Sequence, residues 1–103
     1  MTKFNLYIGL NDKITKKQEI STIEAYKVVT NIIASNEVTG FTIYEANGYY
    51  VHDDKSISIE KSLKIEIMFI DLEVIQNIIK DIKKALNQES IILQTEKIKS
   101  ELV

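Results

Sequence analysis

The sequence predicts an α+β fold whose elements follow in the order strand, helix, strand, strand, helix, strand. Apolar residues alternate with polar ones in several segments, which is the period of a half-buried strand. In two other segments the apolar residues recur at helical spacing. The chain has 103 residues and no repeat, linker or low-complexity segment. We therefore expect a single domain over residues 1–103, because this length is close to the commonest for one hydrophobic core.

The first strand is expected over residues 3–10, where apolar and polar residues alternate, and a polar loop follows over residues 11–18. A capping box then starts a helix. Ser21 can accept a hydrogen bond from the amide of Glu24, whose carboxylate can reach back to the amide of Ser21. The helix should end near residues 35–36. Its apolar stripe consists of Ile23, Ala25, Tyr26, Val28, Val29, Ile32 and Ile33.

The second strand is expected over residues 40–50, and Asn47-Gly48 allows two interpretations of it. This pair is preferred in tight hairpin turns, and such a turn would pair residues 42–46 with residues 49–53. Alternatively, Gly48 lies inside one long strand, as a bulge or at a close approach to another backbone. We favour the bulge over the turn.

The third strand has the most regular pattern, since apolar residues occupy the odd positions from 57 to 69 with Lys61 as the exception. Asp71 can cap a second helix. The apolar stripe of that helix consists of Val74, Ile75, Ile78, Ile79, Ile82 and Leu86. Residues 90–95 predict the last strand, with Ile91 and Leu93 facing inward. The tail over residues 96–103 predicts either a short amphipathic helix or a frayed end.

This element order with short connections favours a ferredoxin-like βαββαβ fold, in which a four-stranded antiparallel sheet carries both helices on one face. The other face of the sheet would have no cover within the chain. It would carry Tyr44, Tyr50, Met68 and Ile70. Oligomerisation is the usual way to cover such a face.

Composition excludes several classes of function. The chain has no cysteine, which excludes disulfides, thiolate zinc sites and cysteine nucleophiles, and a reducing cytoplasm is the expected compartment. No segment approaches the roughly 20 apolar residues of a membrane span, so we expect no membrane association. The net charge is -2 and all positive residues are lysines, which argues against sequence-specific nucleic-acid binding.

Residues 39–49, Thr-Gly-Phe-Thr-Ile-Tyr-Glu-Ala-Asn-Gly-Tyr, resemble the second strand of the PII signal-transduction superfamily. That strand typically reads Gly, apolar, Thr, Val, any residue, Glu, Val, any residue, Gly, aromatic. Residues 63–67, Leu-Lys-Ile-Glu-Ile, are similar to the PII third strand, which also enters a helix through an acidic turn. The resemblance implies a trimer in which each sheet covers its neighbour and clefts form between subunits.

The chain departs from the nitrogen-regulatory PII proteins in two loops. Those proteins have a long loop between strands two and three with a modifiable Tyr and a metal-chelating Gln, whereas only about residues 51–56 fill that span here. They also cradle nucleotide phosphates with a basic, Gly-rich turn before the last strand. Residues 85–90 lack Gly and add Glu89 at that place. Because phosphates need clustered amides and positive charge, we do not expect that turn to bind them.

The candidate ligand or interface residues are Tyr44, Glu45, Tyr49, Tyr50, His52 and Lys61. The tyrosine rings can line a small-molecule cleft, although they are equally common at subunit interfaces. Lys61 breaks an apolar face and marks either a cleft mouth or the twisted end of a hairpin. His52-Asp53-Asp54 is the densest set of potential metal ligands, yet neighbours in an extended strand point to opposite faces, so no metal site is expected.

We therefore expect a non-enzymatic regulatory or adaptor module, without a cofactor, that binds a small molecule or a partner protein at clefts between subunits of a homotrimer. Nucleophile elbows, phosphate-binding loops and zinc spacings are absent from the sequence. The alternative is a small inhibitor or accessory protein of a phage or mobile element that acts through protein contacts. A third hypothesis is an enzyme whose shared active sites use His52.

Overall fold

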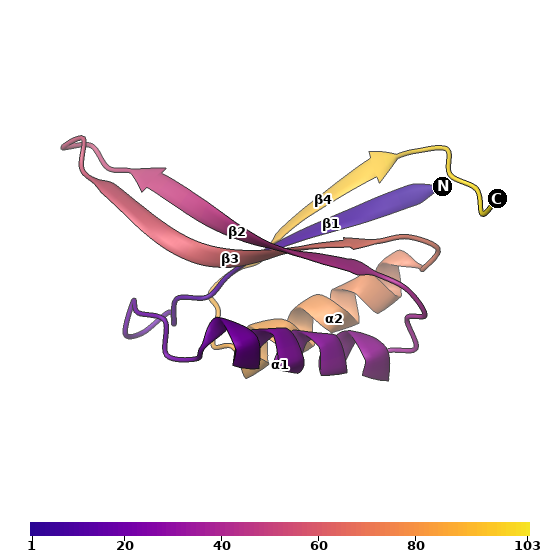
Figure 1. Ribbon diagram of the computed structural model, residues 1–103, viewed down its shortest axis with the longest axis horizontal. Helices are drawn as coiled ribbons and strands as arrows, with labels where there is room; N and C mark the ends of the chain where they lie inside the picture. Colours follow the sequence, from indigo (N-terminus) through magenta and orange to yellow (C-terminus); the bar gives the residue numbers. More distant parts are fainter.

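The computed structural model describes residues 1–103 and confirms the predicted element order (Figure 1). The elements are β1 (Thr2–Gly9), α1 (Thr22–Ser35), β2 (Thr42–Val51), β3 (Ile57–Ile67), α2 (Leu72–Ala85) and β4 (Ile92–Lys97). The strands form one antiparallel sheet in the order β2-β3-β1-β4. Both helices lie on one face of this sheet, as Figure 1 shows, and the other face is open. The fold is ferredoxin-like.

The core lies between the helices and the two central strands. Leu6 and Ile8 of β1 and Leu63, Ile65 and Ile67 of β3 are fully buried. Burying one such side chain contributes about 1.5–3 kcal/mol. The stripe predicted for α2 is confirmed, because its members are either buried or packed against the core. The central strands and helices therefore form a rigid support for the loops at their ends.

The first helix follows the prediction with two corrections. The Ser21 side chain accepts from the amide of Glu24 at 3.1 Å, as predicted. The Glu24 carboxylate, however, pairs with Lys27 Nζ at 3.4 Å instead of reaching back to Ser21. Ile23 is 69% exposed, so it lies outside the buried stripe of α1.

Strands β2 and β3 pair without interruption from Thr42 opposite Glu66 to Val51 opposite Ile57. Asn47 and Gly48 lie inside this ladder, so the hairpin turn considered at that pair is wrong. The favoured interpretation, with Gly48 inside one long strand, is confirmed, but the strand has no bulge, because each residue of β2 has one partner on β3. The chain reverses instead at residues 52–56, where the His52 amide donates to the Ser56 carbonyl at 2.9 Å.

The far half of this ladder extends beyond the helices (Figure 1), and the molecule is 48 Å long. We call residues 48–60 the distal hairpin. Four of its large apolar side chains share one face and are between 60% and 66% exposed. They are Tyr49, Val51, Ile57 and Ile59. Nothing in the chain covers them.

The end of β3 corrects the predicted apolar run. Strand β3 stops at Ile67, and Phe69 has a φ of 63° and a side chain that is 60% exposed. This turn brings Ile70 against the core, so Ile70 does not lie on the open face as predicted. The tail after Lys97 forms no helix, and no helix of the protein is long and apolar enough to cross a membrane.

Candidate ligand-binding site

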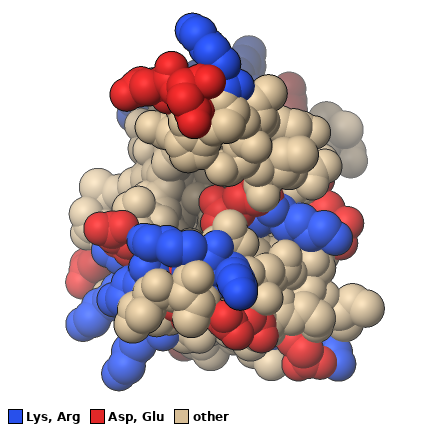
Figure 2. All heavy atoms as spheres, turned by 90° about the vertical axis from the view of Figure 1, so that its left-hand side faces the viewer, with Lys and Arg blue, Asp and Glu red and all other residues tan.

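A cleft lies on the open face of the sheet, where three segments meet. It has a volume of about 520 Å³ and lies between the β1–α1 loop, the α2–β4 turn and the middle of the β2–β3 ladder. We call this space the cleft. Figure 2 looks onto the hairpin end, where the surface is hollowed beneath the hairpin and charged side chains surround the hollow. The volume of the cleft is within the roughly 300–1,000 Å³ typical of small-molecule sites.

A carboxylate is held at the base of the cleft by a glycine and a backbone amide. Glu60 Oε2 accepts from the amide of Asn11 at 2.8 Å. A Cβ atom on Gly9 would lie only 2.6 Å from Glu60 Oε1, so a larger residue at position 9 would displace the carboxylate. Gly9 therefore gives Glu60 room to lie against β1, and Asn11 orients it.

The two loops that wall the cleft are bound to each other. Asn87 Nδ2 donates to Asp12 Oδ2 at 2.9 Å, and the Asn87 carbonyl accepts from the amide of Lys13 at 3.0 Å. Gln88 Nε2 donates to the Asn11 carbonyl at 2.7 Å. Gln88 is only 8% exposed. These bonds fix the width of the cleft, because neither loop can move without breaking them.

Asp12 is charged in this arrangement. The hydrogen bond from Asn87, followed by those from the amides of Ile14 and Thr15, holds the pKa of the Asp12 carboxyl below its usual value. The carboxylate thus organises the β1–α1 loop and attaches it to the α2–β4 turn.

The remaining lining combines an apolar wall with hydroxyl groups. Tyr7 and Ile92 are cross-strand partners on the open face, and Ile92 is 60% exposed. Ser62 lies opposite Gly9, and Ser90 lies in the α2–β4 turn. A planar ring can pack on the apolar wall while its polar substituents reach the hydroxyls and Glu60.

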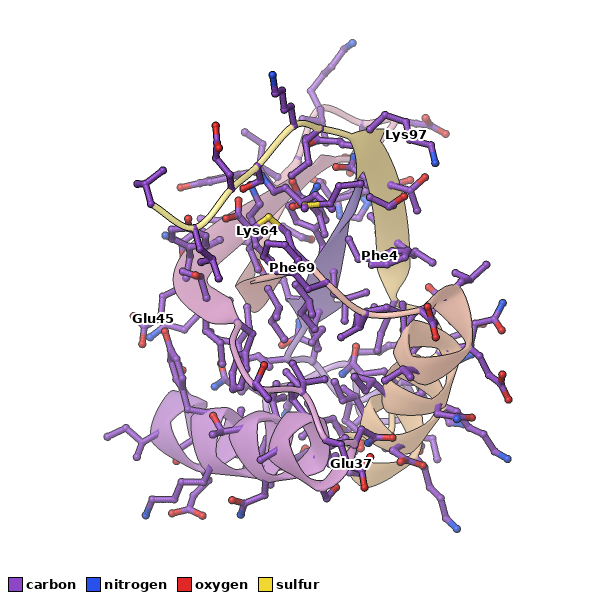
Figure 3. The ribbon with its side chains drawn as sticks, turned by 90° about the vertical axis from the view of Figure 1, so that its right-hand side faces the viewer. Phe4, Glu37, Glu45, Lys64, Phe69 and Lys97 are labelled. Atoms are coloured by element: carbon purple, nitrogen blue, oxygen red, sulfur yellow. The ribbon has the colours of Figure 1, made fainter.

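A separate polar cluster covers the centre of the open face. Glu66 pairs with Lys3 at 3.1 Å and with Lys64 at 3.6 Å, and it accepts from the Tyr44 hydroxyl at 3.1 Å. The hydrogen bond with Lys3 is the main reason that the pKa of Glu66 is lowered and that of Lys3 is raised. Lys64, labelled in Figure 3, also lies 5.6 Å from the Tyr7 ring centroid. The open face is therefore largely polar at its centre.

The residues predicted from sequence fall into three places outside the cleft. Tyr44 belongs to the polar cluster around Glu66. Glu45 and Lys61 border a smaller hollow of about 330 Å³ beside Thr22. Tyr49, Tyr50 and His52 lie on the distal hairpin. Whether they contact a ligand or a second subunit stays a prediction.

His52 makes local contacts at the hairpin tip. Its Nε2 lies 2.7 Å from Ser58 Oγ, and its ring meets Tyr50 edge-on with centroids 4.8 Å apart. The Asp54 carboxylate accepts from the amide and the hydroxyl of Ser56, which lowers the pKa of Asp54. No three His, Asp or Glu side chains in the chain come together as a metal site would require.

Three comparisons with known proteins bear on this geometry. A family model described as a protein of unknown function, DUF3574, matches residues 3–101. No curated protein matches the sequence.

Solved structures with a similar fold include a phage SAM lyase in complex with S-methyl-5′-thioadenosine. It has a TM-score of 0.71 and 18% identity over 93% of this chain and 80% of the other. The GlnK–ATP complex of B. subtilis has a TM-score of 0.60 and 17% identity over 92% and 82%. The periplasmic divalent cation tolerance protein CutA of Archaeoglobus fulgidus has a TM-score of 0.58 and 14% identity over 99% and 88%. These likenesses confirm the predicted PII-like fold.

Proposed function

We propose that this chain, which belongs to the DUF3574 family, is a PII-like module that binds a small adenosine-containing molecule in the cleft. The observation that supports this most is the Glu60 carboxylate, held by Asn11 at 2.8 Å in a polar cleft with an apolar wall. Two solved structures of similar fold contain S-methyl-5′-thioadenosine and ATP, and both of these ligands contain adenosine.

The lining of the cleft suits the parts of an adenosine. The purine would lie on the wall formed by Tyr7 and Ile92, because aromatic and aliphatic surfaces pack on its flat faces. The ribose hydroxyls would donate to Glu60 and reach the Ser62 or Ser90 hydroxyl. A carboxylate binds two hydroxyl donors well, because each of its oxygens has two acceptor sites.

The proposal also includes the oligomeric state of the protein. We propose a homotrimer in which the cleft of each chain opens at the boundary with a neighbouring subunit. The exposed apolar face of the distal hairpin and the unpaired edges of β2 and β4 support it, because monomers rarely leave such surfaces uncovered. The role would be regulatory or adaptor-like and non-enzymatic. A cytoplasmic location fits a chain without cysteine.

A second candidate function follows from the likeness to the phage SAM lyase, whose TM-score is 0.71. In this alternative the chain is an enzyme of phage or mobile-element origin that acts on SAM in the same cleft. Incubation with SAM, followed by chromatography to detect S-methyl-5′-thioadenosine, distinguishes the two candidate functions. Release of that product with turnover supports the enzyme, and binding without turnover supports the module.

Isothermal titration calorimetry with S-methyl-5′-thioadenosine tests the proposed site. We expect one molecule bound per chain, and we expect Ser90→Trp, which fills the cleft, to weaken binding at least about tenfold. Ser35→Trp is the matched control, since Ser35 is exposed at the end of α1, and should bind like the parent. Equal binding by all three proteins would place the ligand elsewhere, and absence of any heat would contradict the proposal.

A further inference from the structure

The backbone amides of the β1–α1 loop, on one side of the cleft, are already in use. Those of residues 11–17 all donate hydrogen bonds within the protein. The Asn11 amide donates to Glu60, the Lys13 amide to the Asn87 carbonyl, and the amides of residues 14 and 15 to the Asp12 carboxylate. The β1–α1 loop therefore has no free amide with which to bind a phosphate.

The α2–β4 turn is engaged in the same way. The amides of Leu86, Asn87 and Gln88 donate to carbonyls in the last turn of α2, at distances from 2.9 to 3.4 Å. The Gln88 side-chain amide donates to the carbonyls of Asn11 and Leu86. Phosphate sites depend on several free backbone amides that point at one spot. The turn offers none at residues 86–88. The amides of Glu89 and Ser90 donate to no group of the protein, but they lie beside the Glu89 carboxylate, and two amides are fewer than the cluster that a phosphate site needs.

The charges in the cleft also oppose an anion. Its lining contains three carboxylates, those of Asp12, Glu60 and Glu89, against the two ammonium groups of Lys13 and Lys16. The lining is thus net negative by one charge, and Glu60 lies at its base. A di- or triphosphate placed there would meet three carboxylates, with only the amides of Glu89 and Ser90 free to donate, and the excess of negative charge raises its free energy.

What the cleft offers instead is acceptors. Glu60 receives only the hydrogen bond from Asn11, so its carboxylate retains accepting capacity. The side-chain carbonyl of Gln88 and the hydroxyls of Ser62 and Ser90 add acceptor positions. Donor groups such as hydroxyls, amines or a cation would satisfy these atoms, and phosphate oxygens would not.

We infer that the cleft selects a phosphate-free ligand that presents hydrogen-bond donors, a nucleoside or a cationic nucleoside derivative, and excludes nucleotides. This inference rests on the proposed function, because it takes the cleft as the ligand site. It narrows the ligand class from adenosine compounds in general to those without phosphate.

Calorimetry with four probes tests the inference: adenosine, S-methyl-5′-thioadenosine, ATP and inorganic pyrophosphate. We expect the two nucleosides to bind at least about tenfold more tightly than ATP and pyrophosphate to give no heat. ATP binding as tight as that of the nucleosides, or pyrophosphate binding in the cleft, overturns the inference while the adenosine site stands. Absence of binding by every probe overturns the proposed function together with the inference.

Glu60→Gln tests whether the Glu60 carboxylate is responsible for the selectivity for nucleosides over ATP. It keeps the shape of the side chain and removes its charge, so we expect nucleoside affinity to fall about tenfold while the preference against ATP narrows. Glu73→Gln, on the exposed start of α2, removes an equal charge far from the cleft and should change neither affinity. An unchanged nucleoside-to-ATP ratio in Glu60→Gln contradicts the role assigned to Glu60.

Discussion

The two halves of the β2–β3 ladder have the same sequence pattern and opposite environments. Near the helices, Ile65 is fully buried and pairs with Ile43. Toward the tip, Ile57 and Ile59 continue the same face of β3, yet each is 60% exposed. Alternation therefore determines which face a side chain lies on, but not what covers that face. In the distal half no part of the chain supplies that cover.

Truncation in the buried half gives the largest expected effect. Ile65→Ala should lower the free energy of unfolding by about 2–5 kcal/mol, because it leaves a cavity between β3 and the helices. Urea denaturation followed by circular dichroism measures it. Ile59→Ala is the matched variant in the distal half and should lower the free energy of unfolding less. The size of its effect should change when the protein is diluted below the concentration at which it assembles. Equal, concentration-independent losses would contradict the distinction between the halves.

Gly9→Ala should give the next largest effect. The added Cβ would meet the Glu60 carboxylate at 2.6 Å and force it away from the Asn11 amide. We expect nucleoside binding to weaken at least about tenfold, while the free energy of unfolding changes little, because the displaced atoms are the end of a flexible side chain. Gly40→Ala is the control, because a Cβ there meets nothing within 4 Å. If the two alanine variants behaved alike, Glu60 would not be held as described.

A charged side chain on the distal hairpin should prevent assembly without preventing folding. Ile59→Lys should reduce the mass measured by light scattering to that of one chain, while the circular dichroism spectrum stays that of the folded protein. The reason is that a lysine cannot be buried against a second subunit without a partner. Ile23→Lys provides the comparison, since Ile23 is 69% exposed but isolated on α1, and its mass should not change. Retention of the full mass in Ile59→Lys would exclude the hairpin from the interface.

The smallest effect concerns acid stability. Since Lys3 lowers the pKa of Glu66, the ionised carboxylate is favoured in the folded state. Its contribution is present above the unfolded pKa of about 4.3 and is lost as the pH falls through the folded pKa. Lys3→Met should therefore reduce the loss of stability on acidification in urea titrations below about pH 5. Lys80→Met on the exposed face of α2 should leave that profile unchanged.

Most of the fold could be predicted from local pattern, because strands and helices bury apolar side chains with different periods. The errors arose where backbone conformation overrides pattern. Asn47-Gly48 has the composition of a turn, but the pairing of residues 42–51 with residues 57–66 is long enough to keep it extended. At Phe69 a left-handed residue ends the alternation, which no periodicity can anticipate.

The cleft could not be predicted, because its residues come from three distant parts of the chain. Tyr7, Asn11, Glu60 and Gln88 meet only through the sheet register and the bonds between two loops. From the sequence we predicted the tyrosines and the histidine of the hairpin as site residues. We did not predict the polar residues of the two loops that wall the cleft. The weak signal available in the sequence was Gly9 at the end of an alternating strand.

Native mass spectrometry in the presence of S-methyl-5′-thioadenosine tests the central claim most directly, because it reports assembly and ligand binding together. We expect a species of three times the 11.8 kDa chain mass with one ligand bound per chain. A single 11.8 kDa chain without ligand, at concentrations where the protein is folded, would contradict it.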